Sequence, residues 1–196
     1  MSVPAPKFRT DRIPPYSEEA ERGVLGAPIV VDDTAGLEVS ELRSRARQIA
    51  RKTGTELIVV DYLQLLHCKE AAREGRQNEV ARISSELKVM AKELHVPVLC
   101  LSQLSRAPES RDTKSGVPKL SDLRDSGAIE QDADVVCLLR RPSYYKDDPD
   151  HEDKTLAILD IAKQRNGPTG EIRLNFHSDY TRFQDRAELP QGGGAP

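Results

Sequence analysis

The chain has 196 residues, of which 37% are hydrophobic, 31% are charged and 4% are aromatic, and it contains no Trp. Globular domains have an apolar share of about 45–50% when Gly is counted, so this composition predicts one domain or two small ones with a modest core. The net charge of -3 argues against a generally basic nucleic-acid-binding protein, so any such binding must come from local patches.

Three scattered cysteines, Cys68, Cys100 and Cys137, form neither a disulfide framework nor a zinc-ligand pattern. Scattered cysteines without a disulfide pattern are typical of proteins in the reducing cytosol, so they predict a cytoplasmic protein. No apolar stretch approaches the roughly 20 residues that a membrane-spanning helix requires, and the N-terminus does not have the pattern of a secretory leader. We therefore expect no membrane partner.

The first residues are predicted to form an arm outside the main domain. Residues 1–15 are rich in Pro and polar residues, a composition typical of disorder. Ser17 can cap a short helix over residues 18–25, and Gly26 ends that helix. Residues 28–32 follow as a short strand or an extended lead-in.

Two longer helices are predicted from apolar residues at helical spacing. The first begins after Ser40 and ends at Gly54, and the second covers residues 76–94. We interpret the cations of the first helix as a solvated face. They are Arg43, Arg45, Arg47, Arg51 and Lys52.

Apolar runs predict five strands separated by these helices and by polar loops. The strands cover residues 57–60, 97–101, 134–139, 156–162 and 172–176, and the loops cover residues 67–76, 105–120 and 142–153. The turn signal from Asn166 to Gly170 joins the last two strands into a C-terminal hairpin. Strand–helix alternation before a terminal hairpin predicts an α/β fold with a mostly parallel sheet.

Two polar residues stand where buried strands end. Asp61 directly follows the run Leu57–Val60, at the sheet edge where α/β proteins place ligands, and an Asp there can hold the Mg²⁺ of a nucleoside triphosphate. Gln103 follows the next strand and shares that edge if the two strands are parallel, where an amide can orient water or sense a phosphate. The plain alternatives are a turn-forming Asp and a polar residue that closes a strand.

Two further segments contain cationic residues that could bind anions. Within residues 121–134, Arg124 can pair with phosphate and Ser126-Gly127 provides a permissive backbone, which together suit a single strand of DNA. The plain alternative is a capped helix start. Lys163 and Arg165 alternate along a strand and so point to one side together, where an anion would relieve their repulsion. Their alternative is an ordinary surface pair.

A Mg-nucleotide site also requires a glycine-rich phosphate cradle with the pattern G-x-x-x-x-G-K-[ST]. Neither Gly-Lys-Ser nor Gly-Lys-Thr occurs among the 196 residues. The sequence therefore carries the back half of a nucleotide motor without its front half.

Four ordered segments resemble the later motifs of the bacterial replicative DNA helicase of the DnaB type, whose motor has a RecA-like fold. They are LIVVDYLQLL, VPVLCLSQLSR, LSDLRDSGAIEQDADVVCLL and IAKQRNGPTGEIRLNF. The resemblance covers residues 29–185. In addition, RIPPYSEEAERGVLGA at residues 12–27 resembles the start of the same helicase's N-terminal domain.

The resemblance implies an internally deleted helicase with a join near Ala27–Pro28. Residues 1–27 would be a disordered arm with a remnant of the N-terminal domain, residues 28–185 a truncated RecA-like motor domain, and residues 186–196 a disordered tail. Such helicases form homo-hexamers that use ATP and Mg²⁺ to unwind DNA in the 5'-3' direction at the replication fork. The implied partners are single-stranded DNA and full-length helicase subunits.

The resemblance also assigns roles to the candidate residues. Asp61 matches the acid of the Mg²⁺ shell, and Gln103 matches the sensor that couples nucleotide to DNA. Lys163 and Arg165 match a pair that reaches the neighbouring subunit's nucleotide, with Arg165 as the arginine finger. The residues that match the DNA-contacting loop are Arg124, Asp125 and Gly127.

We therefore expect a truncated replicative helicase that is inactive by itself because the phosphate cradle is absent, and three rivals to this interpretation remain. The chain could be a non-catalytic module that binds single-stranded DNA or helicase subunits, a non-functional deletion product, or a member of another RecA-like class such as a recombinase. The segments SDLRDSGAIEQDAD and KQRNGPTG argue against the last.

The missing cradle strand also bears on the fold, because in RecA-like motors it lies between the strands that match residues 97–101 and 134–139. Each unpaired buried backbone group costs about 1–3 kcal/mol. We therefore expect these two strands to pair directly, with the helix over residues 76–94 on one face. Alternatively, residues 29–31 fill the slot, or the chain stays partly molten and prone to edge-to-edge aggregation.

Overall fold

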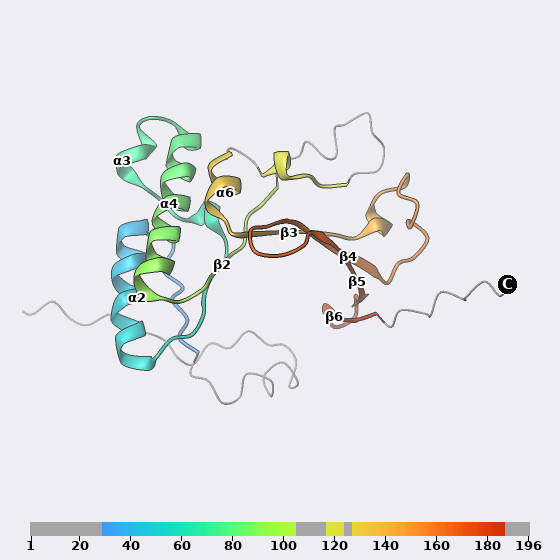
Figure 1. Cartoon of the computed structure of the whole chain (residues 1–196), viewed down its shortest axis with the longest axis horizontal. Helices are drawn as coiled ribbons and strands as arrows, with labels where there is room; N and C mark the ends of the chain where they lie inside the picture. The colour runs from blue at the N-terminus through green and yellow to red at the C-terminus, as the bar shows by residue number, and fades with distance from the viewer. Residues whose placement is uncertain (1–28, 105–116, 124–126, 187–196) are drawn as a thin grey trace, which may run out of the picture.

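The structure is a computed structural model that describes residues 29–104, 117–123 and 127–186 (Figure 1). Two lobes lie side by side along the longest axis of the molecule. We call residues 29–104 the helical lobe and residues 133–186 the sheet lobe. The predictions for residues 1–27 and for the tail beyond Arg186 lie outside the described residues.

The helical lobe is built on helices α2 (Val39–Thr53) and α4 (Arg76–Leu94), which confirm the two predicted longer helices. α2 ends at Gly54, which has the left-handed conformation (φ 65°) that glycine adopts without strain. The apolar stripe of α4 is buried, and Ile83 and Met90 are fully inaccessible to solvent. This burial holds the lobe together, since removing large apolar side chains from water is the dominant stabilising term in folding.

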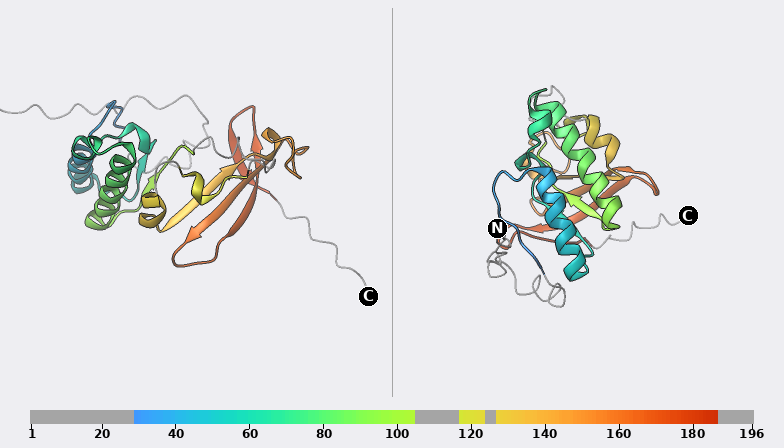
Figure 2. Two further views of the ribbon diagram at one scale, coloured as in Figure 1. Left: turned by 90° about the horizontal axis from the view of Figure 1, so that it is seen from above. Right: turned by 90° about the vertical axis from the view of Figure 1, so that its left-hand side faces the viewer.

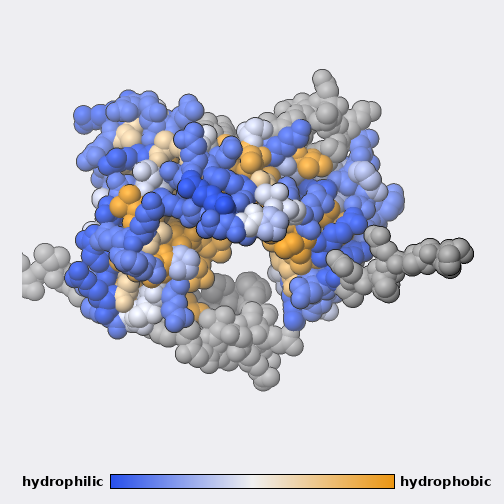
Figure 3. Space-filling view, viewed as in Figure 1, coloured by the Kyte–Doolittle hydropathy of each residue, from blue (hydrophilic) through white to orange (hydrophobic). Residues whose placement is uncertain are grey.

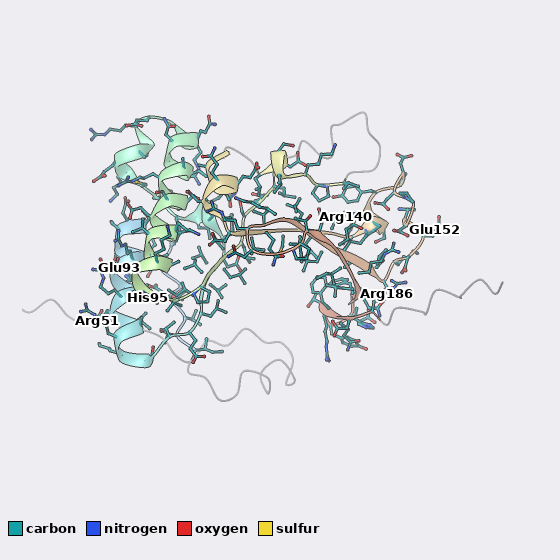
Figure 4. All side chains as sticks on the ribbon, in the orientation of Figure 1. Arg51, Glu93, His95, Arg140, Glu152 and Arg186 are labelled. Atoms are coloured by element: carbon teal, nitrogen blue, oxygen red, sulfur yellow. The ribbon has the colours of Figure 1, made fainter. Side chains whose placement is uncertain are left out.

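Ion pairs join α2 to α4, so the interpretation of a solvated cationic face is wrong for part of α2. Arg43 pairs with Glu86 at 2.9 Å and with Glu93 at 2.7 Å, and Arg47 also reaches Glu93, at 2.6 Å. Figure 4 shows Glu93 on the side of α4 that lies along α2. Because these pairs are near the surface, each contributes at most about 1 kcal/mol, and they align the helices more than they stabilise them.

Strands β1 (Ile58–Val60) and β2 (Val98–Cys100) pair in parallel, with Val60 opposite Cys100. Helices α2 and α4 lie on one side of these strands (Figure 2), and the strand residues that face them pack into the same core cluster. The described residues leave the other face of the strands largely uncovered, and we call its four residues, each about half exposed, the bare face. These residues are Leu57, Val59, Leu99 and Leu101. Parallel sheets are normally covered on both faces, and within the described ranges this two-stranded sheet has such a layer on one face.

The sheet lobe contains four antiparallel strands in the order β3-β4-β5-β6. The hairpin of β4 (Leu156–Gln164) and β5 (Gly170–His177) confirms the predicted C-terminal hairpin. β3 (Val135–Arg140) pairs with β4, and β6 (Arg182–Asp185), which was not predicted, pairs with β5. The α/β class is confirmed. Among the strands of the described ranges, parallel pairing is confined to β1 and β2, because no crossover helix separates the later strands there.

The predicted direct pairing of the strands at 97–101 and 134–139 is wrong. No ladder in the described part of the chain joins β2 to β3, and residues 29–31 form no strand there. Apolar residues instead line both walls of a hollow between the lobes (Figure 3). The prediction failed because it treated the strand edges as buried. Leu99 and Val135 are about half exposed, so these edges can bond to water and the cost of an unpaired buried group does not arise.

Helix α6 (Gly127–Asp132) links the lobes by packing on α4. The Ser84 hydroxyl of α4 donates a hydrogen bond to Asp132 at 2.8 Å, and Ile129 packs against the buried clusters of both lobes. β3 begins directly after α6 and pairs with β4 through one edge. These contacts fix β3 away from β2.

Short elements lie within or beside the predicted loops. They are η1 (Leu63–Leu65), α3 (Lys69–Ala72), η2 (Leu120–Asp122) and η3 (Pro142–Tyr144). Among the helices of the described ranges, none has the length and apolar character needed to cross a bilayer.

Three arginines hold the loop that connects β3 to β4. Arg140 forms an ion pair with the buried Asp148, Arg173 pairs with Asp150, and Arg186 donates to Asp153 at 2.7 Å. Arg186, the first residue of the predicted tail, is thus attached to the sheet lobe (Figure 4).

Candidate functional site

The carboxyl ends of β1 and β2 bring two of the candidate residues to one edge. Asp61 directly follows β1 and Gln103 lies three residues beyond β2, and both are exposed. Because the strands are parallel and in register, the shared edge predicted for these two residues is confirmed. The Leu101 N–H donates to the Val60 carbonyl and the Leu63 N–H donates to the Leu101 carbonyl, each at 2.9 Å, so the two strand ends are tied together.

Gln64, on the turn after Asp61, extends this connection with its side chain. Its amide nitrogen donates to the Ser102 hydroxyl at 3.1 Å and to the Gln103 carbonyl at 3.3 Å. Its amide oxygen accepts the Gln103 N–H at 3.2 Å. The Gln64 side chain therefore hydrogen-bonds both the N–H and the carbonyl of Gln103.

A buried acid in the first turn of α4, Glu79, supports the turn that carries Gln64. Glu79 accepts the Cys68 N–H at 3.0 Å and an Arg76 N–H at 2.7 Å, and Arg76 also donates to the Gln64 carbonyl at 2.9 Å. Burial alone would raise the pKa of Glu79, but the Cys68 amide and the Arg76 guanidinium outweigh burial, and the pKa lies below its ordinary value.

Lys163 and Arg165 form a second group, at the end of α6. Lys163 Nζ donates to the Glu130 carbonyl, and an Arg165 guanidinium N–H donates to the Gln131 carbonyl. The last carbonyls of a helix lack partners within the helix and attract cations. Both side chains point to the same side, as their alternation along the strand predicted. Lys163 is half-buried, and the Arg165 side chain is 50% exposed.

Asp134 connects the second group to α4. Its carboxylate pairs with Lys88 and lies 3.7 Å from Arg165 Nε, while its carbonyl accepts the Arg165 N–H at 2.9 Å. The hydrogen bond from Lys88 lowers the pKa of Asp134, and the charge of Arg165 adds to the effect. Asp134 therefore stays ionised at neutral pH and keeps Arg165 close to α6.

The predicted DNA-contacting loop is only partly described. Arg124 and Asp125 lie outside the described residues. Gly127 begins α6, is exposed, and has open space where a side chain would stand. Just before this loop, Asp122 is fully buried and accepts the Lys119 N–H at 2.7 Å.

A Mg-nucleotide complex does not fit the residues at the edge of β1 and β2. The carboxylate of Asp61 is exposed, and within the described ranges no three potential ligands gather around a cation position. The chain also has no Gly-Lys-Ser or Gly-Lys-Thr whose backbone and Lys could hold a triphosphate. One carboxylate and one amide hold a hydrated Mg²⁺ only when phosphate oxygens and further ligands complete its octahedron.

Sequence reasoning missed Gln64, Asp134 and the supporting Glu79. A signal existed for Gln64, which is the single polar residue within Leu63–Leu66. Glu79 stands on the apolar face of a predicted amphipathic helix, one residue before Val80. A charged residue there requires a buried partner, and that requirement is the signal that could have found it.

Comparisons with known proteins agree on one family. The family model of the DnaB-like helicase C-terminal domain matches residues 6–185. Replicative DNA helicase DnaB of Geobacillus stearothermophilus is 41% identical over 201 residues, covering 97% of this chain and 43% of that protein. Replicative DNA helicase DnaC of Bacillus subtilis is 45% identical over 168 residues, covering 86% and 36%.

Solved structures show the same relationship. A DnaB-like replicative helicase, described together with its interactions with primase, has a TM-score of 0.75 and 41% identity over 86% of this chain and 39% of that one. A second solved structure, of an ATPase domain, gives the same TM-score and identity over 86% and 58%. The chain spans less than half the length of the two curated relatives. The fold is RecA-like, and the chain belongs to the family of the DnaB-like helicase C-terminal domain.

Proposed function

We propose that this chain is the back half of a replicative DNA helicase motor and that, by itself, it neither hydrolyses ATP nor unwinds DNA. Full members of the family use ATP and Mg²⁺ to move along single-stranded DNA and separate the strands of a duplex. The supporting observation is an Asp61–Gln103 edge in a chain without a Gly-Lys-Ser or Gly-Lys-Thr cradle. Phosphoryl transfer depends on positioning and charge stabilisation of the triphosphate, and the cradle supplies most of both.

ATP turnover by the purified chain tests this proposal. We expect turnover at background with Mg-ATP, with or without single-stranded DNA, under conditions in which a full-length replicative helicase is active. DNA-stimulated turnover that Asp61→Ala abolishes and Asp33→Ala preserves would refute it. Asp33 is an exposed acid in the same lobe and serves as the matched control.

A second candidate function is a non-catalytic module that binds full-length helicase subunits in the cytoplasm. The observation that favours it is Arg165, which is half exposed on the sheet lobe and, among the described residues, contacts the end of the short helix α6 and Asp134. Released from α6, Arg165 could reach a neighbouring subunit's nucleotide. Such a subunit would complete that neighbour's site yet leave its own inactive, and so would inhibit a ring that requires sequential firing.

Mixing the chain with full-length helicase tests this second candidate. Dose-dependent inhibition should disappear with Arg165→Ala and persist with Arg173→Ala, an exposed arginine of β5. Inhibition that is equal in both variants would indicate competition for DNA instead. Failure to co-purify with helicase subunits would favour a non-functional deletion product.

Single-stranded DNA should bind weakly to the isolated chain. Backbone contacts gain strength from several subunits along one strand, and a net charge of -3 provides little electrostatic steering. Titration of a labelled oligonucleotide at moderate salt tests this expectation. Sub-micromolar affinity that survives Arg124→Ala would contradict both the weakness and the assigned loop.

A further inference from the structure

We infer that Gln64 is a positioning residue whose carboxamide substitutes for a strand residue and fixes the Gln103 backbone at the edge that carries Asp61. The inference rests on the proposed function only for the role of Gln103. It concerns the site's internal organisation, which the family resemblance does not assign.

The geometry begins where the β1–β2 ladder ends. Val60 and Cys100 are the last paired residues of the parallel sheet. After Asp61 the chain turns into η1, whose Leu63 N–H still bonds the Leu101 carbonyl, but in the described part of the chain no backbone group beyond β1 bonds residue 102 or 103. Without a substitute, the N–H and C=O of Gln103 would have no partner from β1.

The Gln64 side chain supplies that partner. A carboxamide carries one carbonyl and one NH₂ group, the same donor and acceptor types that a peptide group presents. Its oxygen accepts the Gln103 N–H at 3.2 Å and its nitrogen donates to the Gln103 carbonyl at 3.3 Å. This two-point contact has the form of one further rung of the ladder. Glu lacks the donor and Leu lacks both groups.

The backbone of Gln64 is itself fixed from α4. Arg76 donates to the Gln64 carbonyl at 2.9 Å, and the carboxylate of Glu79 holds Arg76 at 2.7 Å. The Glu79 side chain is only 8% exposed, and it also accepts the Cys68 N–H. These bonds fix the backbone of Gln64, so the hydrogen bonds of its side chain can restrain the position of Gln103.

Gln103 stands between two restraints. On one side is the contact with Gln64, and on the other is the bridge that pairs Leu104 with Leu123. Leu123 directly precedes Arg124 in the sequence. The contact with Gln64 therefore lies directly before the bridge that joins the end of the helical lobe to the segment ahead of α6.

Residue-resolved amide hydrogen exchange of the purified chain tests the inference. In Gln64→Ala, the Gln103 amide should exchange roughly fivefold to tenfold faster, the change expected from loss of one net hydrogen bond of about 1 kcal/mol. The Leu101 amide, which donates to Val60, should keep its protection. In Gln64→Glu, the Gln103 amide should keep most of its protection, because an acceptor oxygen remains at the same distance along the side chain.

Two results would overturn the inference. One is unchanged exchange of the Gln103 amide in Gln64→Ala. The other is an equal loss of protection along β1 and β2 together with a lower urea midpoint, which would show that Gln64 supports the whole sheet and does not specifically position Gln103. ATP turnover by the chain would refute the proposed function and leave the exchange result standing, so the two failures are distinguishable.

Discussion

The helical lobe and the sheet lobe keep their strands in place by different means. In the helical lobe, two strands of three residues each lie under helices that bury a cluster of ten residues. In the sheet lobe, four strands of four to nine residues form antiparallel ladders, with a register shift in the β3–β4 ladder between Val136 and Cys137. Helices that pack onto short strands hold one lobe, and longer strands paired side by side build the other.

The comparison also shows what the lobes share. Each leaves apolar side chains of its strands exposed, the bare face in the helical lobe and Val135, Cys137 and Leu139 of β3 in the sheet lobe. In an α/β fold a layer of helices normally covers such sheet faces. Exposed apolar strand faces of this kind favour self-association.

The largest expected effect is on the core of the helical lobe. Ile83→Ala removes a fully buried side chain and should destabilise the chain by about 2–5 kcal/mol. Val89→Ala, at an exposed position of the same helix, is the matched control and should stay within about 0.5 kcal/mol of the parent chain. Urea midpoints measure both. Equal effects would mean that burial does not dominate this lobe.

A smaller effect is expected at Glu79 and should depend on pH. The folded pKa lies below the ordinary 4.5, so the stabilisation is complete above that pH and is lost as the pH falls through the folded value. At pH 7, Glu79→Gln should cost about 1–3 kcal/mol, the range for a buried hydrogen bond to a charged group.

Urea midpoints of the parent chain and Glu79→Gln, from pH 7 down to about pH 3, test the sign. The difference should shrink as the solution becomes acidic. Glu74→Gln, at an exposed acid just before α4, provides the control and should show little difference at any pH. A difference between parent and Glu79→Gln that is constant with pH would contradict the proposed network.

The bare face should affect association more than folding. Leu99→Lys places a charge at an exposed position and should change the unfolding free energy by no more than about 0.5 kcal/mol, while it reduces concentration-dependent self-association. Sedimentation velocity at several concentrations is the measurement. Val98→Lys, which points toward the helices, should instead destabilise the lobe. Unaltered association in Leu99→Lys would locate the contact elsewhere.

The smallest expected effect concerns the rates at which the three cysteines react with a labelling reagent. Cys137 lies on the exposed face of β3 and should react readily with a water-soluble thiol reagent. Burial raises the pKa of Cys100 to about 11, so this thiol stays protonated and should react slowly, as should the buried Cys68. Mass spectrometry of partially labelled protein ranks the three. Protection of Cys137 would show that the hollow is filled in solution.

Local patterns predicted local structure well. The helices over residues 40–54 and 76–94 follow from apolar periodicity, and the β4–β5 hairpin follows from Asn166-Gly167 and the glycine at 170, because each signal lies within the element it specifies. β6 was missed because its four residues, Arg182–Asp185, include a single apolar side chain. The shared edge of Asp61 and Gln103 required one assumption, parallel pairing, which the structure bears out.

Non-local features could not be predicted in this way. Whether β2 pairs with β3 depends on where α6 docks on α4, and the sequence of neither strand contains that information. The contact of Gln64 with Gln103 spans 39 residues, and that of Lys88 with Asp134 spans 46. Such partners are determined by the packing of the lobes.

Equilibrium binding of a fluorescent ATP analogue tests the central claim most directly, because it measures the function of the phosphate cradle without requiring turnover. The purified chain is titrated with the analogue and Mg²⁺ beside a full-length replicative helicase, and fluorescence anisotropy is recorded. We predict no saturable binding at concentrations that saturate the full-length protein. Saturable binding by the chain that Asp61→Ala removes would contradict this claim.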